Sequence, residues 1–119
     1  MRAQFVRGID PKKSMKLGKF DPKTRKNFLS EICQDILHAF QKLKEELNIL
    51  GVLNPGFYFE GPIEEWKTEV DLRIDQTQET YFIVWDEEKY IAGVSGEKLI
   101  RSEHDNLSDA INQIKKLLL

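Results

Sequence analysis

The chain has 119 residues, of which 40% are hydrophobic and 32% are charged, and its formal net charge is −2. This length suits one domain with a single hydrophobic core and is too short for two ordinary domains. The composition excludes a disordered chain. No apolar run approaches the ~20 residues that a membrane span requires, so the sequence also excludes a membrane-spanning helix. We therefore expect a soluble protein.

Two features of the sequence bear on cellular location. The only cysteine, Cys33, cannot form an intramolecular disulfide or a cysteine-cluster metal site. The start of the chain, residues 1–8, lacks the apolar run and the small-residue cleavage site of a secretory signal. Both features agree with a reducing compartment, and we expect a cytoplasmic location.

Basic residues are concentrated at the start of the chain. Residues 1–26 carry nine basic and two acidic side chains, a net charge of +7, whereas residues 27–119 carry nine basic and eighteen acidic ones, a net charge of −9. A basic arm on an acidic body is typical of contact with a polyanion, but the arm could instead fold back on its own body. We assign residues 1–21 to the arm and residues 22–119 to a single domain. The candidate anion-binding residues of the arm are Arg7, Lys12, Lys13, Lys16 and Lys19.

Two Asp-Pro pairs predict helix starts, because Asp is a good N-cap and Pro suits the first helical position. The pair at residues 10–11 predicts a marginal helix that ends near Leu17. The pair at residues 21–22 begins a long helix that runs to Leu50 and is closed by Gly51. Its apolar stripe consists of Phe28, Leu29, Ile32, Cys33, Ile36, Ala39, Phe40, Leu43, Leu47 and Leu50. The spacing also permits a coiled coil, but the width of the stripe favours packing on a sheet.

The segment of residues 52–65 is interrupted by turn signals. Asn54-Pro55-Gly56 and Gly61-Pro62 leave only residues 57–60 free to pair with another strand. We expect these four residues to form either a short edge strand or an aromatic loop at the end of the core.

Residues 66–95 predict three consecutive antiparallel strands. Apolar and polar residues alternate without a break over residues 66–75, as in a strand with one buried and one exposed face. Two further runs, 80–85 and 90–95, follow after polar clusters that are typical of turns.

The turns set the register of these strands. With two-residue loops, Asp75 lies opposite Thr80, and Trp85 lies opposite Tyr90. The helices before and after the sheet are expected to cover its apolar face. That face carries Val70, Leu72, Ile74, Tyr81, Ile83, Trp85, Tyr90, Ala92 and Val94.

The opposite face of the sheet is predicted to bind a partner. An apolar centre with charged neighbours is typical of a protein-binding or dimer surface, and we expect any self-association to use this face. The alternative is that apolar residues of the arm cover it. The candidate partner-binding residues are Phe82, Val84, Ile91, Lys67 and Arg73, and the apolar arm residues are Phe5, Val6, Met15, Leu17 and Phe20.

The end of the chain predicts a second helix. Residues 98–100 extend the sheet or add an edge strand, and residues 102–106 are expected to be a polar loop. A short amphipathic helix follows, with Asn106 or Ser108 as its N-cap. The predicted fold is therefore α+β in the order α-β-β-β-α. It is a three- or four-stranded antiparallel meander with a long N-terminal and a short C-terminal helix on one face.

No motif in the sequence indicates catalysis, a cofactor or a metal. The only histidines, His38 and His104, have no carboxylate or cysteine at the spacing of a metal or catalytic signature, and we expect His104 in a solvated loop. Cys33 occupies a core position, where a thiol is protected from ionising. The acidic clusters at residues 64–65 and 86–88 lack the spaced ligands of a calcium loop. We predict that the protein is not an enzyme and holds no metal or cofactor.

Two classes of function remain. The first is a non-catalytic interaction domain that binds another protein or itself through the exposed sheet face and the basic arm. The second is nucleic-acid binding, because the order helix, three strands, helix is also that of double-stranded RNA-binding domains, and a basic arm would add phosphate contacts. This likeness concerns the order of elements alone. The likeness fails at the last helix, which begins Asn106-Leu-Ser-Asp-Ala without a lysine cluster. It also fails because residues 27–119 have a negative net charge.

Overall fold

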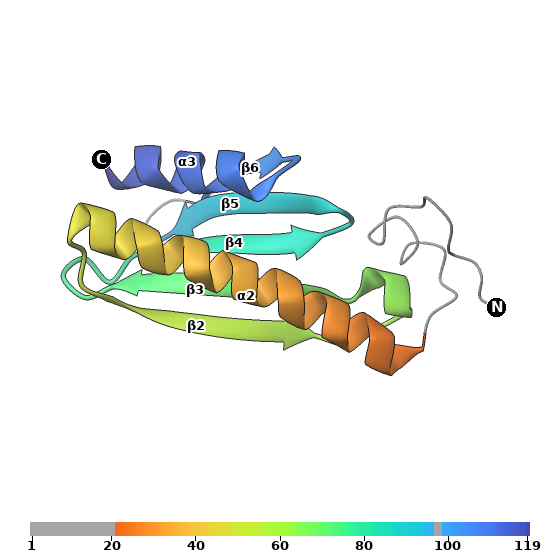
Figure 1. Cartoon of the computed structure of the whole chain (residues 1–119). Coiled ribbons are helices and arrows are strands. Elements are labelled where there is room, and N and C mark those ends of the chain that lie inside the picture. Colours follow the sequence, from red (N-terminus) through yellow and green to blue (C-terminus); the bar gives the residue numbers. More distant parts are fainter. Residues whose placement is uncertain (1–20, 97–98) are drawn as a thin grey trace.

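The computed structural model of the chain describes residues 21–96 and 99–119. These residues form one long helix, one antiparallel sheet of five strands and one short helix, in that order (Figure 1). The predicted α+β class is confirmed, and the sheet has five strands where three or four were expected. The short helix predicted near residues 11–17 lies outside the described residues.

The long helix α2, Pro22–Leu47, begins where the sequence predicts and ends three residues earlier than expected. The Asp21 side chain caps it by accepting a hydrogen bond from the Thr24 backbone N–H at 2.8 Å. The apolar stripe continues to Leu50, but Asn48 adopts the left-handed conformation (φ 55°, ψ 50°) and ends the helix. Asn tolerates this conformation better than most residues, so the local cap decides where the helix stops.

Strand β2, Gly51–Tyr58, lies mostly before the predicted segment, because of residues 57–60 only 57 and 58 belong to it. All eight of its residues pair with strand β3, Lys67–Ile74. Pro55 is tolerated because β2 lies at an edge of the sheet, where a missing N–H can face away from the neighbouring strand. The turn signal around Pro55 therefore marks an edge strand. A 3-10 helix, η1 (Ile63–Glu65), connects β2 to β3.

Strands β4 (Thr80–Asp86), β5 (Lys89–Ser95) and β6 (Ile100–His104) complete a meander in the order β2-β3-β4-β5-β6. Trp85 pairs with Tyr90, as predicted. Each strand therefore lies beside its neighbour in the chain, which is the simplest antiparallel topology.

The register between β3 and β4 differs from the prediction by two residues. Thr80 lies opposite Arg73, where Asp75 was expected. A longer turn causes the difference, because the Ile74 N–H closes it by donating to the Glu79 carbonyl oxygen at 2.9 Å. A shift of two residues keeps every side chain on the same side of the sheet, so the predicted faces are retained.

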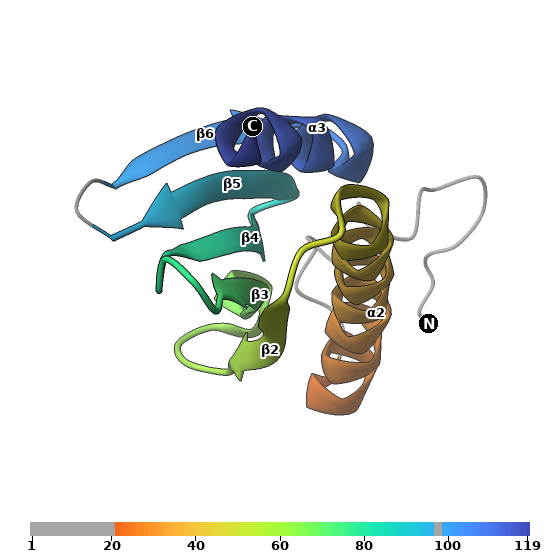
Figure 2. The ribbon, with the colours of Figure 1, turned by 90° about the vertical axis from the view of Figure 1, so that its left-hand side faces the viewer.

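Both helices cover the same face of the sheet (Figure 2). Helix α2 lies against β2 and β3, and the short helix α3, Leu107–Leu118, lies against β4, β5 and β6. Asn106 caps α3, as predicted, by accepting a hydrogen bond from the Asp109 N–H at 2.9 Å. The predicted apolar faces are buried between the layers. The core consists of Phe28, Leu29, Ile32, Cys33, Ile36, Phe40, Leu43, Val70, Leu72, Tyr81, Ile83, Trp85, Tyr90, Ala92, Val94, Ala110 and Ile114.

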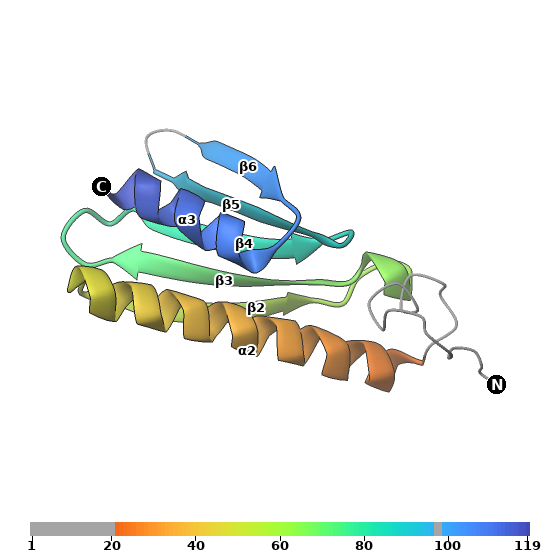
Figure 3. The same cartoon turned by 45° about the horizontal axis from the view of Figure 1, so that its top comes forward.

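Strand β6 occupies most of the segment that was expected to be a polar loop. It pairs with β5 along all five of its residues and lies at the outer side of the sheet (Figure 3). Gly93 permits this pairing, because a Cβ there would overlap the Ile100 carbonyl oxygen and lie 3.0 Å from the Arg101 Cα. A glycine inside β5 therefore allows β6 to approach closely.

Candidate interaction surface

The open face is the side of the sheet opposite α2 and α3, and neither of these helices covers it (Figure 2). It is formed by alternate residues of all five strands. All five residues that the sequence assigns to a partner surface lie on it. Its side chains belong to Val52, Asn54, Tyr58, Lys67, Glu69, Asp71, Arg73, Thr80, Phe82, Val84, Asp86, Lys89, Ile91, Ser95, Arg101 and Glu103.

Three apolar side chains from two strands form the middle of the open face, and we call Phe82, Val84 and Ile91 the apolar centre. Val84 of β4 lies opposite Ile91 of β5, and Phe82 lies opposite Gly93. The Phe82 ring leans over Gly93, since a Cβ there would lie 2.8 Å from the ring carbon Cζ. All three apolar side chains are half-buried by their neighbours in the sheet.

Charged residues flank the apolar centre on both sides. On β3, Glu69 lies opposite Val84, and Asp71 lies opposite Phe82. On β6, Glu103 lies opposite Ile91. The open face thus combines an apolar middle with a charged rim, which is the arrangement typical of protein-binding surfaces.

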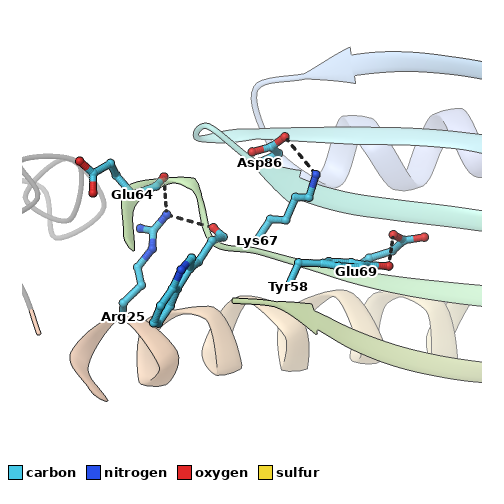
Figure 4. Close-up of polar contacts among 7 residues, drawn as sticks. Arg25, Tyr58, Glu64, Lys67, Glu69 and Asp86 are labelled. Carbon is cyan, nitrogen blue, oxygen red and sulfur yellow. Dashed lines mark hydrogen bonds and ion pairs between the residues drawn. The ribbon is translucent and has the colours of Figure 1, made fainter. Parts of the chain in front are cut away.

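Polar contacts fix several charges of this rim. Lys67 Nζ lies 3.9 Å from Asp86 Oδ2, and the Tyr58 hydroxyl donates to Glu69 Oε1 at 3.1 Å (Figure 4). The negative charge of Glu69, followed by burial, raises the pKa of Tyr58. Arg73 is exposed at the other end of β3. Exposed ion pairs add only about 0 to 1 kcal/mol of stability, so these contacts serve mainly to position the side chains.

Asp71 has an environment unlike that of an exposed carboxylate. Its side chain is half-buried, and its Oδ1 atom is buried without a hydrogen-bond partner among the described residues. Burial is the main cause that raises the pKa of Asp71 to about 7, and the hydrogen bond and charge of Glu69 add to it. The open face therefore carries a carboxyl group that titrates near neutral pH.

A hollow of about 620 Å³ lies at one end of the open face, and we call it the end hollow. It is lined by Tyr58, Glu60, Gly61, Glu65, Lys67, Glu69 and Val84. Its three glutamates outnumber its one lysine, so it favours a positively charged group. The sequence alone did not reveal it, because only the pairing of β2 with β3 brings the segment around Glu60 beside Glu69.

Arg25 belongs to the core, although the sequence grouped it with the basic residues of the chain start. Its side chain is 1% exposed, and its Nη2 atom donates to the carbonyl oxygens of Glu64 at 3.1 Å and Trp66 at 3.2 Å (Figure 4). Its guanidinium carbon lies 5.2 Å from the centroid of the Trp85 ring. Burial lowers the pKa of Arg25, which starts from so high a value that the side chain stays charged. Arg25 therefore ties α2 to the start of β3.

Two exposed aromatic side chains and one half-buried one gather near the start of α2, and we call Phe57, Phe59 and Trp66 the aromatic cluster. The Phe57 and Phe59 rings stack with centroids 5.6 Å apart, and the Phe59 and Trp66 centroids are 5.1 Å apart. Lys26 Nζ lies 4.8 Å from the Phe59 centroid. Phe57 and Phe59 are each 40% exposed, so this cluster can stack on a ligand.

The other candidates for chemistry lie away from the open face. Cys33 is buried in the core, as predicted, and His38 is exposed on α2. His104 was expected in a solvated loop but is half-buried in β6, where its Nε2 atom lies 2.7 Å from Ser102 Oγ. Within the described ranges, no group of three or more His, Cys, Asp or Glu side chains is placed to hold a metal ion.

The role of the arm at this surface stays a prediction. Its candidate residues Arg7, Lys12, Lys13, Lys16 and Lys19, and its apolar residues, lie outside the described residues. No helix in residues 21–96 and 99–119 is long and apolar enough to cross a membrane. Comparison of the chain with protein-family models, characterised proteins and solved structures finds no match.

Proposed function

We propose that the protein is a non-catalytic interaction domain that binds a protein partner through the open face. The observation that supports this proposal is the apolar centre. Phe82, Val84 and Ile91 lie together on the side of the sheet that α2 and α3 leave uncovered, and acidic and basic side chains flank them. Burying such a centre against a partner removes apolar surface from water, while the charged rim selects the partner.

The chemistry of the open face specifies what such a partner carries. An apolar side chain packs on Phe82, Val84 and Ile91, and a lysine or arginine enters the end hollow among its glutamates.

A Phe82→Lys variant tests the proposal. Affinity capture with the full-length protein supplies candidate partners, and calorimetry with each purified candidate measures its Kd. We expect Phe82→Lys to weaken the interaction at least about ten-fold, because it places a charge in the apolar centre. Gln34→Lys is the matched control, since Gln34 is exposed on α2 and receives the same charge change.

Circular dichroism and thermal unfolding establish that both variants are folded. A partner whose Kd is raised by Phe82→Lys and is unchanged by Gln34→Lys supports the open face as the binding surface. If every partner binds Phe82→Lys and the parent equally well, the proposed surface is wrong.

Nucleic-acid binding is a second candidate, and the aromatic cluster is the observation that favours it. Phe57 and Phe59 are exposed, Lys26 lies over the Phe59 ring, and α2 begins directly after the basic arm. Exposed aromatic rings beside lysines can stack on unpaired bases. The glutamates of the end hollow oppose this use, because they repel phosphates.

A further inference from the structure

The two edges of the described sheet differ in how they are protected against pairing with another chain. Strand β2 carries Pro55, and proline in an edge strand interrupts the row of backbone donors. Strand β6, Ile100–His104, contains no proline, and no described strand lies against its outer edge (Figure 3). An edge whose backbone donors are not interrupted by proline is a template for an additional strand.

We propose that the outer edge of β6 pairs with the same edge of a second copy of this chain, in the antiparallel direction, to form one continuous sheet. This proposal is independent of the proposed function of the open face. It places self-association at an edge of the sheet, whereas the sequence alone suggested the open face.

Charge complementarity identifies a second copy of this chain as the partner of the β6 edge. Arg101 and Glu103 are exposed on the open face, and neither forms an ion pair with another residue of the described ranges. In a two-fold arrangement centred on Ser102, Arg101 of each copy lies opposite Glu103 of the other. Two reciprocal pairs of opposite charge therefore form directly across the new strand pair, where such pairs are stabilising.

The same arrangement accounts for an exposed apolar residue on the other side of β6. Ile100 is 43% exposed, although it lies on the helix side of the sheet. Pairing centred on Ser102 places Ile100 of one copy opposite His104 of the other. The His104 ring is held by its contact with Ser102 Oγ at 2.7 Å, so it offers a fixed surface to cover Ile100.

Other registers are unfavourable. A two-fold axis normal to the sheet requires residues of the same face to lie opposite each other, so the centre moves in whole residues along β6. A centre at Arg101 places two arginines opposite each other, and a centre at Glu103 places two glutamates opposite each other. Like charges in these positions are destabilising, and a centre at Ile100 or His104 pairs only one residue of β6 with β6 of the other copy, so the centre at Ser102 is selected.

Charge reversal tests this arrangement through the oligomeric state of the full-length protein. Sedimentation velocity over a range of concentrations should show a dimer for the parent. Arg101→Glu and Glu103→Arg should each raise the dimer Kd about ten-fold or more, since each replaces two attractive pairs by two repulsive ones. An equimolar mixture of the two variants should dimerise again, because every Arg or Glu then meets its opposite. Arg73→Glu, on the open face away from β6, is the matched control and should behave as the parent.

The double variant with Arg101→Glu and Glu103→Arg keeps opposite charges across the strand pair and should also dimerise. It shows that loss of the dimer in a single variant comes from like charges and not from a failure to fold. A parent that stays monomeric at every concentration overturns the proposal. A dimer that both single variants retain, or a mixture that stays monomeric, overturns it equally. The Phe82→Lys variant separates this edge from the open face, because it should weaken partner binding and leave the β6 dimer intact.

Discussion

Asp71 is a carboxyl group on the open face whose pKa, about 7, lies well above the ~3.9 of an ordinary Asp. Between these two values the folded protein binds more protons than the unfolded chain. The stability that Asp71 contributes is therefore fully present below about pH 4, and it is lost as the pH rises through about 7. Its buried Oδ1 atom and the neighbouring Glu69 explain why ionisation is unfavourable there.

An Asp71→Asn variant should remove this loss of stability at high pH. At about pH 8 we expect its free energy of unfolding to exceed that of the parent by about 1 kcal/mol, a value that allows for solvent screening at a half-buried site. At about pH 4 the two should agree, because Asp71 is then protonated. Urea unfolding at several pH values measures both.

Asp75→Asn is the control for this series, because Asp75 is an exposed carboxylate directly after the end of the same strand. It should show no comparable rise with pH. A stability difference for Asp71→Asn that stays constant from acid to alkaline pH would mean that Asp71 ionises like an exposed residue.

Among the elements, those set by local signals were predictable from the sequence, and those set by distant partners were not. Asp21 and Asn106 cap α2 and α3 where the sequence places them, because a cap acts on backbone groups within one turn. Strand β2 exceeds its prediction because β3 offers a partner along its whole length. Strand β6 can pair along its whole length because Gly93 of β5 lets its backbone approach closely. The sequence marked only residues 57–60 and 98–100 as edge-strand candidates, because the full extent of each pairing depends on the neighbouring strand.

A Leu43→Ala variant tests the packing of α2 on the sheet. Leu43 is 2% exposed and is the last buried residue of α2, so its truncation should lower the free energy of unfolding by about 2 to 5 kcal/mol. Gln34→Ala, on the exposed side of the same helix, should change it by no more than about 0.5 kcal/mol. Denaturant unfolding compares the two. Equal midpoints for Leu43→Ala and the parent would show that α2 does not pack as described.

At the scale of the whole molecule, the period of two along each strand and the predicted turns were enough to place Phe82, Val84 and Ile91 together. Alternation fixes the face of each side chain, and a register error of two residues leaves that face unchanged. The end hollow and the burial of Arg25 depend on how β2, η1 and α2 meet in space, so they could not be predicted. The net charge of the chain start therefore overstated the number of free basic groups, since Arg25 is a core residue.

Charge also separates the two candidate functions. Residues 27–119 carry a net charge of −9, and the end hollow is lined by three glutamates, so the body repels a polyanion. We expect the full-length protein to bind duplex RNA and DNA weakly at moderate salt. Neutralising the arm should then change that weak affinity little. The variant for this test replaces Arg7, Lys12, Lys13, Lys16 and Lys19 by Gln.

Binding measured at low and moderate salt, with the parent, the neutralised variant and a chain without residues 1–20, decides between the two functions. If the arm serves nucleic-acid binding, log affinity should fall with log salt by ~0.7 to 0.9 per phosphate contacted, and both altered chains should lose the binding. That result would replace the protein-interaction proposal. If the arm instead contacts the acidic body, the chain without residues 1–20 should unfold at a lower denaturant concentration and bind more of a hydrophobic dye. The reason is that the arm has more apolar residues, such as Phe5 and Phe20, than a purely electrostatic tail requires. We expect the lower stability and the greater dye binding, since the basic arm and the acidic body attract each other.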